Sequence, residues 1–216
     1  MLKTGNTIID LFSQVNIFFP LLPVIIIFFR GIYQKESLNY LVILCLLNFC
    51  QDIAMQTLHV TYVNQSSIRN IFSLLELIVV VQIFKTILRD RFREMINIIT
   101  IALLSAMVTY FFVKGADQKN LALETLKNGF IIILTAYSLV AIVQSENLRI
   151  FYSPVFWIAT GTLFYFAIVL LLDFVDQCCP ELQNPIATDK MLLLNVASVA
   201  RYFFYTLATV AVTRLE

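Results

Sequence analysis

Long apolar runs, separated by short polar links, occupy almost the whole chain. Each run holds about 20 residues, the length that an α-helix needs to cross the hydrocarbon core of a bilayer. The pattern predicts an all-α integral membrane protein, a seven-transmembrane helix bundle that forms a single domain over residues 1–216 without a soluble domain. The predicted spans are Ile8–Phe29, Leu38–Val60, Ile68–Leu88, Met95–Val113, Leu121–Val143, Pro154–Val175 and Lys190–Thr213.

Prolines mark two of these spans. Pro20 and Pro23 stand inside the first span, where the ring and the missing N–H of proline kink or loosen a helix. Pro154 stands at the start of the sixth span, a position in the first turn that suits proline well. The fourth span is the most uniformly apolar, so we expect it to be the helix most exposed to lipid.

The composition agrees with a membrane location and argues against several classes of function. Hydrophobic residues make up 60% of the chain and charged residues 13%, with a mean hydropathy of +0.85, whereas soluble domains have about 25% charged residues. We expect the lipid bilayer of a cell (plasma or inner) membrane as the main partner. The net charge of +1 gives no argument for a nucleic-acid partner. One His and four Cys do not make up the usual zinc site, so we expect neither a metal nor a cofactor.

The positive charges of the short links predict the orientation, because Lys and Arg accumulate on the cytoplasmic side. Seven basic residues stand in the links after spans one, three and five and at the C-terminus, against five in the other links and the N-terminus. The densest group is Arg89, Arg91 and Arg93. We therefore expect the N-terminus outside, the C-terminus inside, and a cytoplasmic surface at these arginines where a separate signalling partner binds.

A polar stripe interrupts the second span. It consists of Asn48, Gln51, Asp52, Gln56 and His59, at offsets that place them on one face of a helix. A charged side chain at the centre of a membrane helix costs about 2.5–3.5 kcal/mol. The stripe should therefore face a partner helix or a wet cavity rather than lipid.

Charged residues of two further spans fall at a similar depth. Asp52 and Glu76 each stand eight residues from the predicted outer end of their spans, and Arg201 about eleven. At 1.5 Å per residue they lie roughly 12, 12 and 16 Å deep. Because Arg holds carboxylates bidentately and stays charged, we predict one cluster of these three residues with Arg201 at its centre. Polar neighbours on the last span complete the predicted binding residues: Asn195, Tyr202 and Tyr205.

Two interpretations of this cluster remain open. Polar residues in membrane bundles often join helices to one another, at about 0.6 kcal/mol for an average interaction, and a buried Arg–carboxylate pair then only fixes the helix register. Intramembrane charges also mark binding sites and ion pathways. We favour a functional site for Asp52, Glu76 and Arg201, and contacts between helices for most of the uncharged polar positions.

Spans three and seven resemble one another faintly. Asn70–Glu76 aligns without gaps with Asn195–Arg201, and an Asn and a Ser match at the same offsets. Such an alignment suits a 3+1+3 arrangement in which the apolar fourth span links two parallel repeats, as in the SWEET transporters. Three matched polar positions are few, and chance is the favoured explanation.

The chain has the features of a receptor or sensor module more than those of an enzyme. It has no Gly-rich phosphate loop, no G-x-S-x-G motif and a single His, which argues against hydrolase chemistry. In size, span count and orientation it resembles the stand-alone seven-helix membrane modules of bacterial sensory systems, an analogy of architecture. We therefore predict an outward-facing pocket for a small-molecule ligand. The alternatives are a small-solute or proton-coupled transporter and a structural subunit of a membrane complex.

Overall fold

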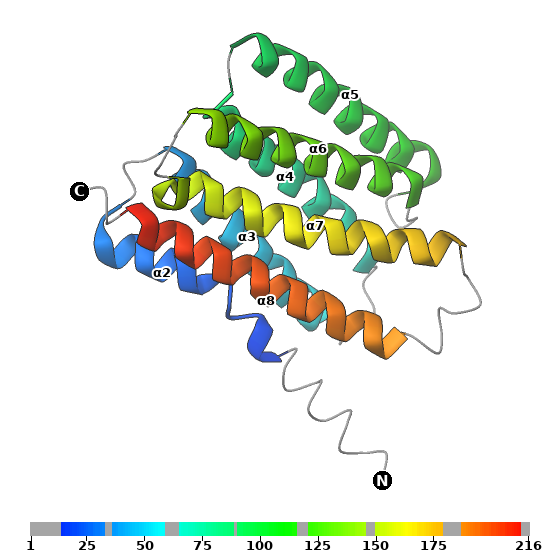
Figure 1. Ribbon diagram of the computed structural model, residues 1–216. Helices are drawn as coiled ribbons and strands as arrows, with labels where there is room; N and C mark the ends of the chain where they lie inside the picture. The colour runs from blue at the N-terminus through cyan, green and yellow to red at the C-terminus, as the bar shows by residue number, and fades with distance from the viewer. Residues whose placement is uncertain are drawn as a thin grey trace.

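The chain folds into a bundle of helices (Figure 1). The computed structural model describes residues 14–32, 36–58, 65–88, 90–115, 121–145, 150–178 and 187–212. Of these residues 93% are helical and none belongs to a strand, which confirms the predicted all-α class.

Six helices of the described part are long and apolar enough to cross a membrane. Each of them overlaps one of the predicted spans. They are α3 (Glu36–Leu58), α4 (Gln65–Lys85), α5 (Asp90–Lys114), α6 (Leu121–Ser145), α7 (Pro154–Cys178) and α8 (Ala187–Val212). A shorter helix, α2 (Leu21–Arg30), precedes them, and a short 3₁₀ helix, η1 (Ile150–Tyr152), precedes α7.

The helix starts differ from the predicted span starts where charged residues open a helix. α5 begins at Asp90 rather than at Met95, because its first turn is highly charged and a hydropathy pattern recognises only the apolar part of a helix. α7 begins at Pro154, as predicted from the preference of proline for the first turn.

The first predicted span is broken at a proline. The described chain is helical from Gln14 to Asn16, then turns, and forms α2 only after Pro20. Short-range hydrogen bonds close these turns, from the N–H of Phe18 to the carbonyl of Val15 and from the N–H of Leu21 to the carbonyl of Phe18, both at 3.1 Å. Because Pro20 has no N–H to donate, the helix is interrupted where the sequence predicted it to be loosened. The N-terminal part of this span lies outside the described residues.

The helices pack in two layers (Figure 1). α6, α7 and α8 lie side by side in one layer, α3 and α4 lie side by side behind them, and α2 packs against α3 and α8. α5 lies at one edge, against α4 and α6. Only 17% of its most apolar stretch is buried, against 28–39% in the other five long helices. This confirms that the predicted fourth span is the most exposed of them.

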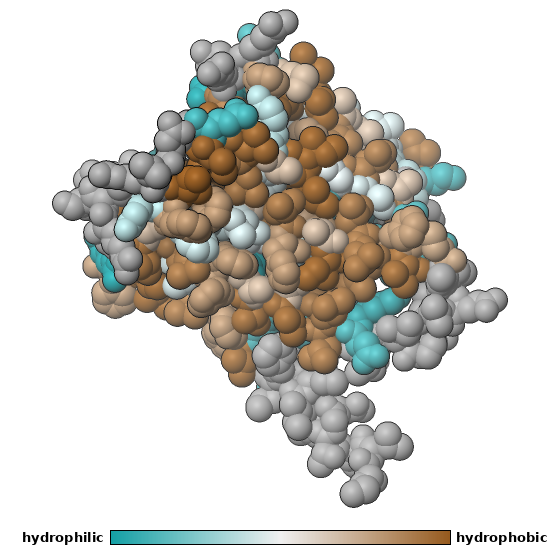
Figure 2. All heavy atoms as spheres, viewed as in Figure 1, coloured by the Kyte–Doolittle hydropathy of each residue, from teal (hydrophilic) through white to brown (hydrophobic). Residues whose placement is uncertain are grey.

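Apolar side chains form both the core and much of the outer surface. Leu41 of α3 and Leu77 and Phe84 of α4 are completely buried, whereas Ile98 and Phe112 of α5 are largely exposed. Apolar side chains cover the middle of the face seen in Figure 2, and hydrophilic ones lie mostly toward its margins. An exposed apolar surface of this extent is typical of a protein that contacts lipid or partner helices.

Gly161 lets α7 approach α8 closely. A Cβ atom at this position would lie 2.8 Å from the Cβ of Phe204 and 3.0 Å from the backbone oxygen of Arg201. The next residue, Thr162, shares a buried hydrogen bond of 2.9 Å with the hydroxyl of Tyr205. These contacts fix the register of α8, and with it the level at which the charge of Arg201 stands in the bundle.

Candidate ligand-binding site

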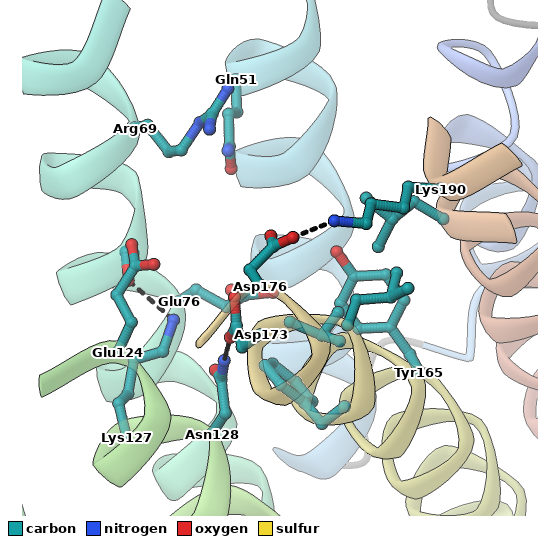
Figure 3. A pocket seen from close by; sticks show the side chains of 15 residues that line it. Gln51, Arg69, Glu76, Glu124, Lys127, Asn128, Tyr165, Asp173, Asp176 and Lys190 are labelled. Atoms are coloured by element: carbon teal, nitrogen blue, oxygen red, sulfur yellow. Dashed lines mark hydrogen bonds and ion pairs between the residues drawn. The ribbon is translucent and has the colours of Figure 1, made fainter. Parts of the chain in front are cut away.

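A polar pocket lies where α3 and α7 end and α4, α6 and α8 begin (Figure 3). We call this end of the bundle the pocket end. The volume of the pocket is about 390 Å³. Its lining comes from five helices: Gln51 from α3; Arg69, Ser73 and Glu76 from α4; Glu124, Lys127 and Asn128 from α6; Tyr165, Phe166, Val169, Leu172, Asp173 and Asp176 from α7; and Lys190 and Leu194 from α8.

Helical spacing brings the polar lining residues to one face of each helix. Ser73 and Glu76 are three residues apart on α4, and Glu124 and Lys127 are three residues apart on α6, the spacing of neighbours on a helix surface. Across the pocket Asp173 of α7 faces α6 (Figure 3). The lining therefore combines carboxylates with basic groups, so it suits a ligand that carries charge.

Arg201 supports two of the lining residues from inside the bundle. It is only 3% exposed, and its Nη1 donates to Oε1 of Glu76 at 3.0 Å. Its Nη2 donates to the hydroxyl of Tyr202 at 2.9 Å, and its guanidinium lies 3.9 Å from the centre of the Tyr165 ring. The guanidinium is thus neutralised by a carboxylate and stacked on an aromatic face, a favourable place for a buried cation.

Two of the three predicted cluster residues are in direct contact in the bundle. Arg201 and Glu76 form the predicted ion pair. Asp52, on α3, is partly buried, interacts electrostatically with Arg201 and Glu76, and is not among the residues that line the pocket. The depth comparison therefore identified the pair of Glu76 and Arg201, while a role of the three residues in binding stays a prediction.

The remaining predicted residues of α3 have different surroundings. Gln51 lines the pocket. Asn48, one turn deeper, is buried in the bundle, whereas Gln56 is exposed. His59 lies outside the described residues. The predicted stripe therefore faces the interior of the bundle at Asn48 and becomes exposed at Gln56, nearer the pocket end.

The predicted residues of α8 beside Arg201 make contacts within the bundle. Tyr202 accepts the hydrogen bond from Arg201, and Tyr205 is bonded to Thr162. Asn195 accepts a hydrogen bond of 3.2 Å from Nδ2 of Asn16, which precedes α2. The contacts of Tyr205 and Asn195 join helices to one another, as the structural interpretation expects of uncharged polar residues.

The sequence prediction missed most of the pocket wall on α6 and α7. Lys127 is 5% exposed, and its Nζ donates to Oγ of Ser73 at 2.7 Å. Nδ2 of Asn128 donates to Oδ2 of Asp173 at 3.1 Å. The available signal was the helical spacing of Glu124, Lys127 and Asn128 in the first turns of a membrane-length helix.

A further ion pair joins two helices beside the pocket. Lys190, in the first turn of α8, pairs with Asp176 in the last turn of α7. The next residue of α7, Gln177, donates to the hydroxyl of Thr125 on α6 at 3.0 Å. These contacts hold α7 against both of its neighbours at the pocket end.

A second cavity, of about 250 Å³, lies at the opposite end, where α3 and α5 begin and α4 ends. Arg93 lines it and donates from Nε to the backbone oxygen of Lys85 at 2.8 Å, which ties the start of α5 to the end of α4. Arg89 and the side chain of Arg91, the other arginines of the predicted partner surface, lie outside the described part. The lining residues are Glu36, Gln82, Lys85, Thr86, Arg93 and Asn97.

No protein-family model, curated protein or solved structure matches this chain. Among the described residues no group of three or more His, Cys, Asp or Glu side chains is placed to hold a metal ion. The functional argument therefore depends on the polar pocket and its charges.

Proposed function

We propose that the chain is a receptor or sensor-type membrane module that binds a small polar molecule in the polar pocket and signals through a separate partner. In this proposal the chain crosses the cell membrane seven times, and the broken helix containing α2 is the first crossing. The N-terminus and the pocket end lie outside, and the C-terminus lies inside. The observation that carries the proposal is the pocket, whose lining includes acidic and basic side chains from several helices.

The construction of the pocket supports a binding role. Its walls belong to helices of both layers, so a ligand contacts α4, α6, α7 and α8 at once. A ligand favours whichever helix arrangement it contacts best, and this shifts the population of arrangements. Charges inside a membrane bundle cost free energy and usually serve a function, which favours a ligand site over a structural subunit.

The packing beyond the pocket supports a receptor over a transporter. Toward the opposite end the interior is filled with completely buried apolar side chains, including Leu41 of α3, Phe84 of α4 and Val212 of α8. These residues belong to one hydrophobic core. This core separates the polar pocket from the second cavity, so a bound solute is held at one end of the bundle.

The output surface in this proposal is the basic link between α4 and α5. Arg89, Arg91 and Arg93 would lie on the cytoplasmic side, where an acidic surface of a signalling partner is complementary to them. The hydrogen bond from Arg93 to the carbonyl of Lys85 couples this link to α4. α4 also carries Glu76 and Ser73 at the pocket end, so it connects the two ends of the molecule.

A transporter for small solutes is the second candidate, because one observation favours it. The first helix is broken before α2, and Asn16 at the break is hydrogen-bonded to Asn195 of α8. Broken helices near polar groups are typical of transporter binding sites.

A thermal-unfolding screen in nanodiscs tests the proposed function. The purified protein is melted in the presence of small carboxylates, amines, zwitterions and neutral polar solutes. A ligand at about one hundred times its Kd stabilises the folded state by about 2.7 kcal/mol, which is easily measured. We expect one chemical class to raise the melting temperature.

Two matched variants of α7 locate the binding site. Val169→Trp fills the pocket and should abolish the stabilisation by solute. Leu171→Trp places the same bulk on a side chain that is 56% exposed on the outside of the bundle, so it should leave the stabilisation unchanged. Stabilisation by no solute, or equal loss in both variants, would contradict a receptor pocket. Uptake of the stabilising solute into proteoliposomes would favour the transporter.

A further inference from the structure

Of the cations beside the polar pocket, two form ion pairs with carboxylates and a third is exposed to solvent. Arg201 is bonded to Glu76 at 3.0 Å. Lys190 forms an ion pair with Asp176. Arg69 is exposed, where water or salt screens its charge. None of these three groups requires a ligand to neutralise it.

Lys127 is different, because it is a buried cation whose hydrogen-bond partner is neutral. Its Nζ donates to Oγ of Ser73 at 2.7 Å and lies 5.9 Å from the centre of the Phe166 ring. Among the described residues no carboxylate oxygen lies within 4.0 Å of this nitrogen. An ammonium group has three N–H donors, so the hydroxyl of Ser73 satisfies only part of its capacity.

The acids that share the pocket with Lys127 have partners of their own. Oε1 of Glu76 accepts from Arg201, and Oδ2 of Asp173 accepts from Asn128. Glu124, one turn earlier on the same helix, takes part in another contact. The carboxylates of the pocket wall are therefore engaged elsewhere, and none of them forms an ion pair with the ammonium of Lys127 among the described residues.

Among the described residues, Lys127 lacks an anionic group in direct contact with its ammonium. A buried charge without a counter-charge is unfavourable in a low-dielectric interior, and an anion in the pocket removes that penalty. Because Glu124 and Asp173 also line the pocket, a singly charged carboxylate is repelled less than a doubly charged phosphate. We infer that the pocket binds a small organic carboxylate that pairs with Lys127. This inference rests on the proposed function, because it assigns the ligand class of the same site.

The wild-type protein in nanodiscs provides the first test. Butyrate, lactate and glycine are each compared with their primary amides, butyramide, lactamide and glycinamide, by melting temperature as a function of solute concentration. A charged hydrogen bond is stronger than a neutral one by an amount that corresponds to a roughly ten- to hundredfold change in affinity. We expect at least one acid to stabilise the protein at a concentration lower than that of its amide by this factor.

Variants of Lys127 provide the second test. Lys127→Met should weaken stabilisation by the acid roughly ten- to hundredfold and should raise the melting temperature of the ligand-free protein, because an unbalanced buried charge is removed. Lys127→Arg should retain most of the binding. Lys85→Met, at the second cavity, is the matched control and should leave binding unchanged.

The outcomes separate this inference from the proposed function. Stabilisation by amines or amides but by no acid, or unchanged acid binding in Lys127→Met, would overturn the inference and leave the receptor function standing. Stabilisation by no solute at all would overturn both. If Lys127→Met fails to fold, the acid–amide comparison on the wild type and the Lys127→Arg variant still decide.

Discussion

Nη1 of Arg201 on α8 donates a hydrogen bond to Oε1 of Glu76 on α4 at 3.0 Å, across 125 positions of sequence. The two side chains are 4% and 13% exposed, and the ring of Tyr165 packs against the guanidinium. Each side chain stabilises the charge of the other, because removing either one would leave a buried charge without a counter-charge. Since Glu76 and Tyr165 also line the polar pocket, this pair links the stability of the bundle to the shape of the pocket.

Replacing Arg201 by Leu should destabilise the protein strongly. The change leaves the carboxylate of Glu76 buried without a cation and removes the group that attracts Asp52, and breaking one side of a buried pair costs about 3–5 kcal/mol. The measurement is the melting temperature in one detergent, compared with Lys114→Leu, which removes an exposed charge at the end of α5.

The double variant Arg201→Leu with Glu76→Gln should recover part of the lost stability, because no unpaired charge of the pair then remains. Under the proposed function its stabilisation by solute should stay reduced, since Glu76 belongs to the pocket wall. Recovery of both the melting temperature and solute binding would show that the pair only holds the helices together.

The close approach of α7 and α8 predicts a difference between two glycines. Gly161→Ala places a Cβ 2.8 Å from the Cβ of Phe204, and overpacking of this kind costs about 1–3 kcal/mol. Gly129→Ala meets nothing within 4 Å and should be neutral or stabilising by up to about 1 kcal/mol, because Ala is the better helix former. Melting temperatures of the two variants compare them, and equal effects would contradict the packing of α7 on α8.

The orientation can be tested with cysteines at the two ends of the bundle. Cys178 is exposed at the end of α7, at the pocket end, while Gln144 is exposed near the end of α6, at the opposite end. In a protein whose only cysteine is Cys178, a membrane-impermeant thiol reagent should label intact cells. With Gln144→Cys as the only cysteine, labelling should require permeabilised cells. The reverse pattern would invert the predicted topology.

The sequence predicts the helices well, because the hydropathy of a segment and the position of its prolines determine locally where a helix forms and where it is interrupted. It places the start of α7 at Pro154, and it predicts a kink or loosening at Pro20 and Pro23. The break is found at Pro20, whereas Pro23 stands in the first turn of α2. The sequence misplaces the start of α5 at Met95 instead of Asp90. A helix can begin in its charged segment before the apolar stretch that a hydropathy pattern detects, so the pattern sees only part of the helix.

The sequence predicts only part of the site, because lateral packing is not encoded in any one helix. Depth alone brought Glu76 and Arg201 together, since both are charged and stand at a similar level. Depth could not show that α6 packs against α7, so the contact of Asn128 with Asp173 and the burial of Lys127 were missed. The neighbours of a polar face become known only when the order of the helices around the bundle is known.

The most direct test of a solute-binding pocket inside the bundle is the reactivity of a cysteine placed in its wall. Leu172 lines the pocket, whereas Leu41 of α3 is completely buried in the apolar core. Each is changed to Cys in a protein without other cysteines, and the rate of modification by a small water-soluble thiol reagent is measured with and without the stabilising solute. We predict that Leu172→Cys reacts, that the solute slows the reaction, and that Leu41→Cys stays unreactive while folded. A Leu172→Cys protein that melts normally and reacts no faster than Leu41→Cys, or that reacts at the same rate with the solute bound, would contradict the account.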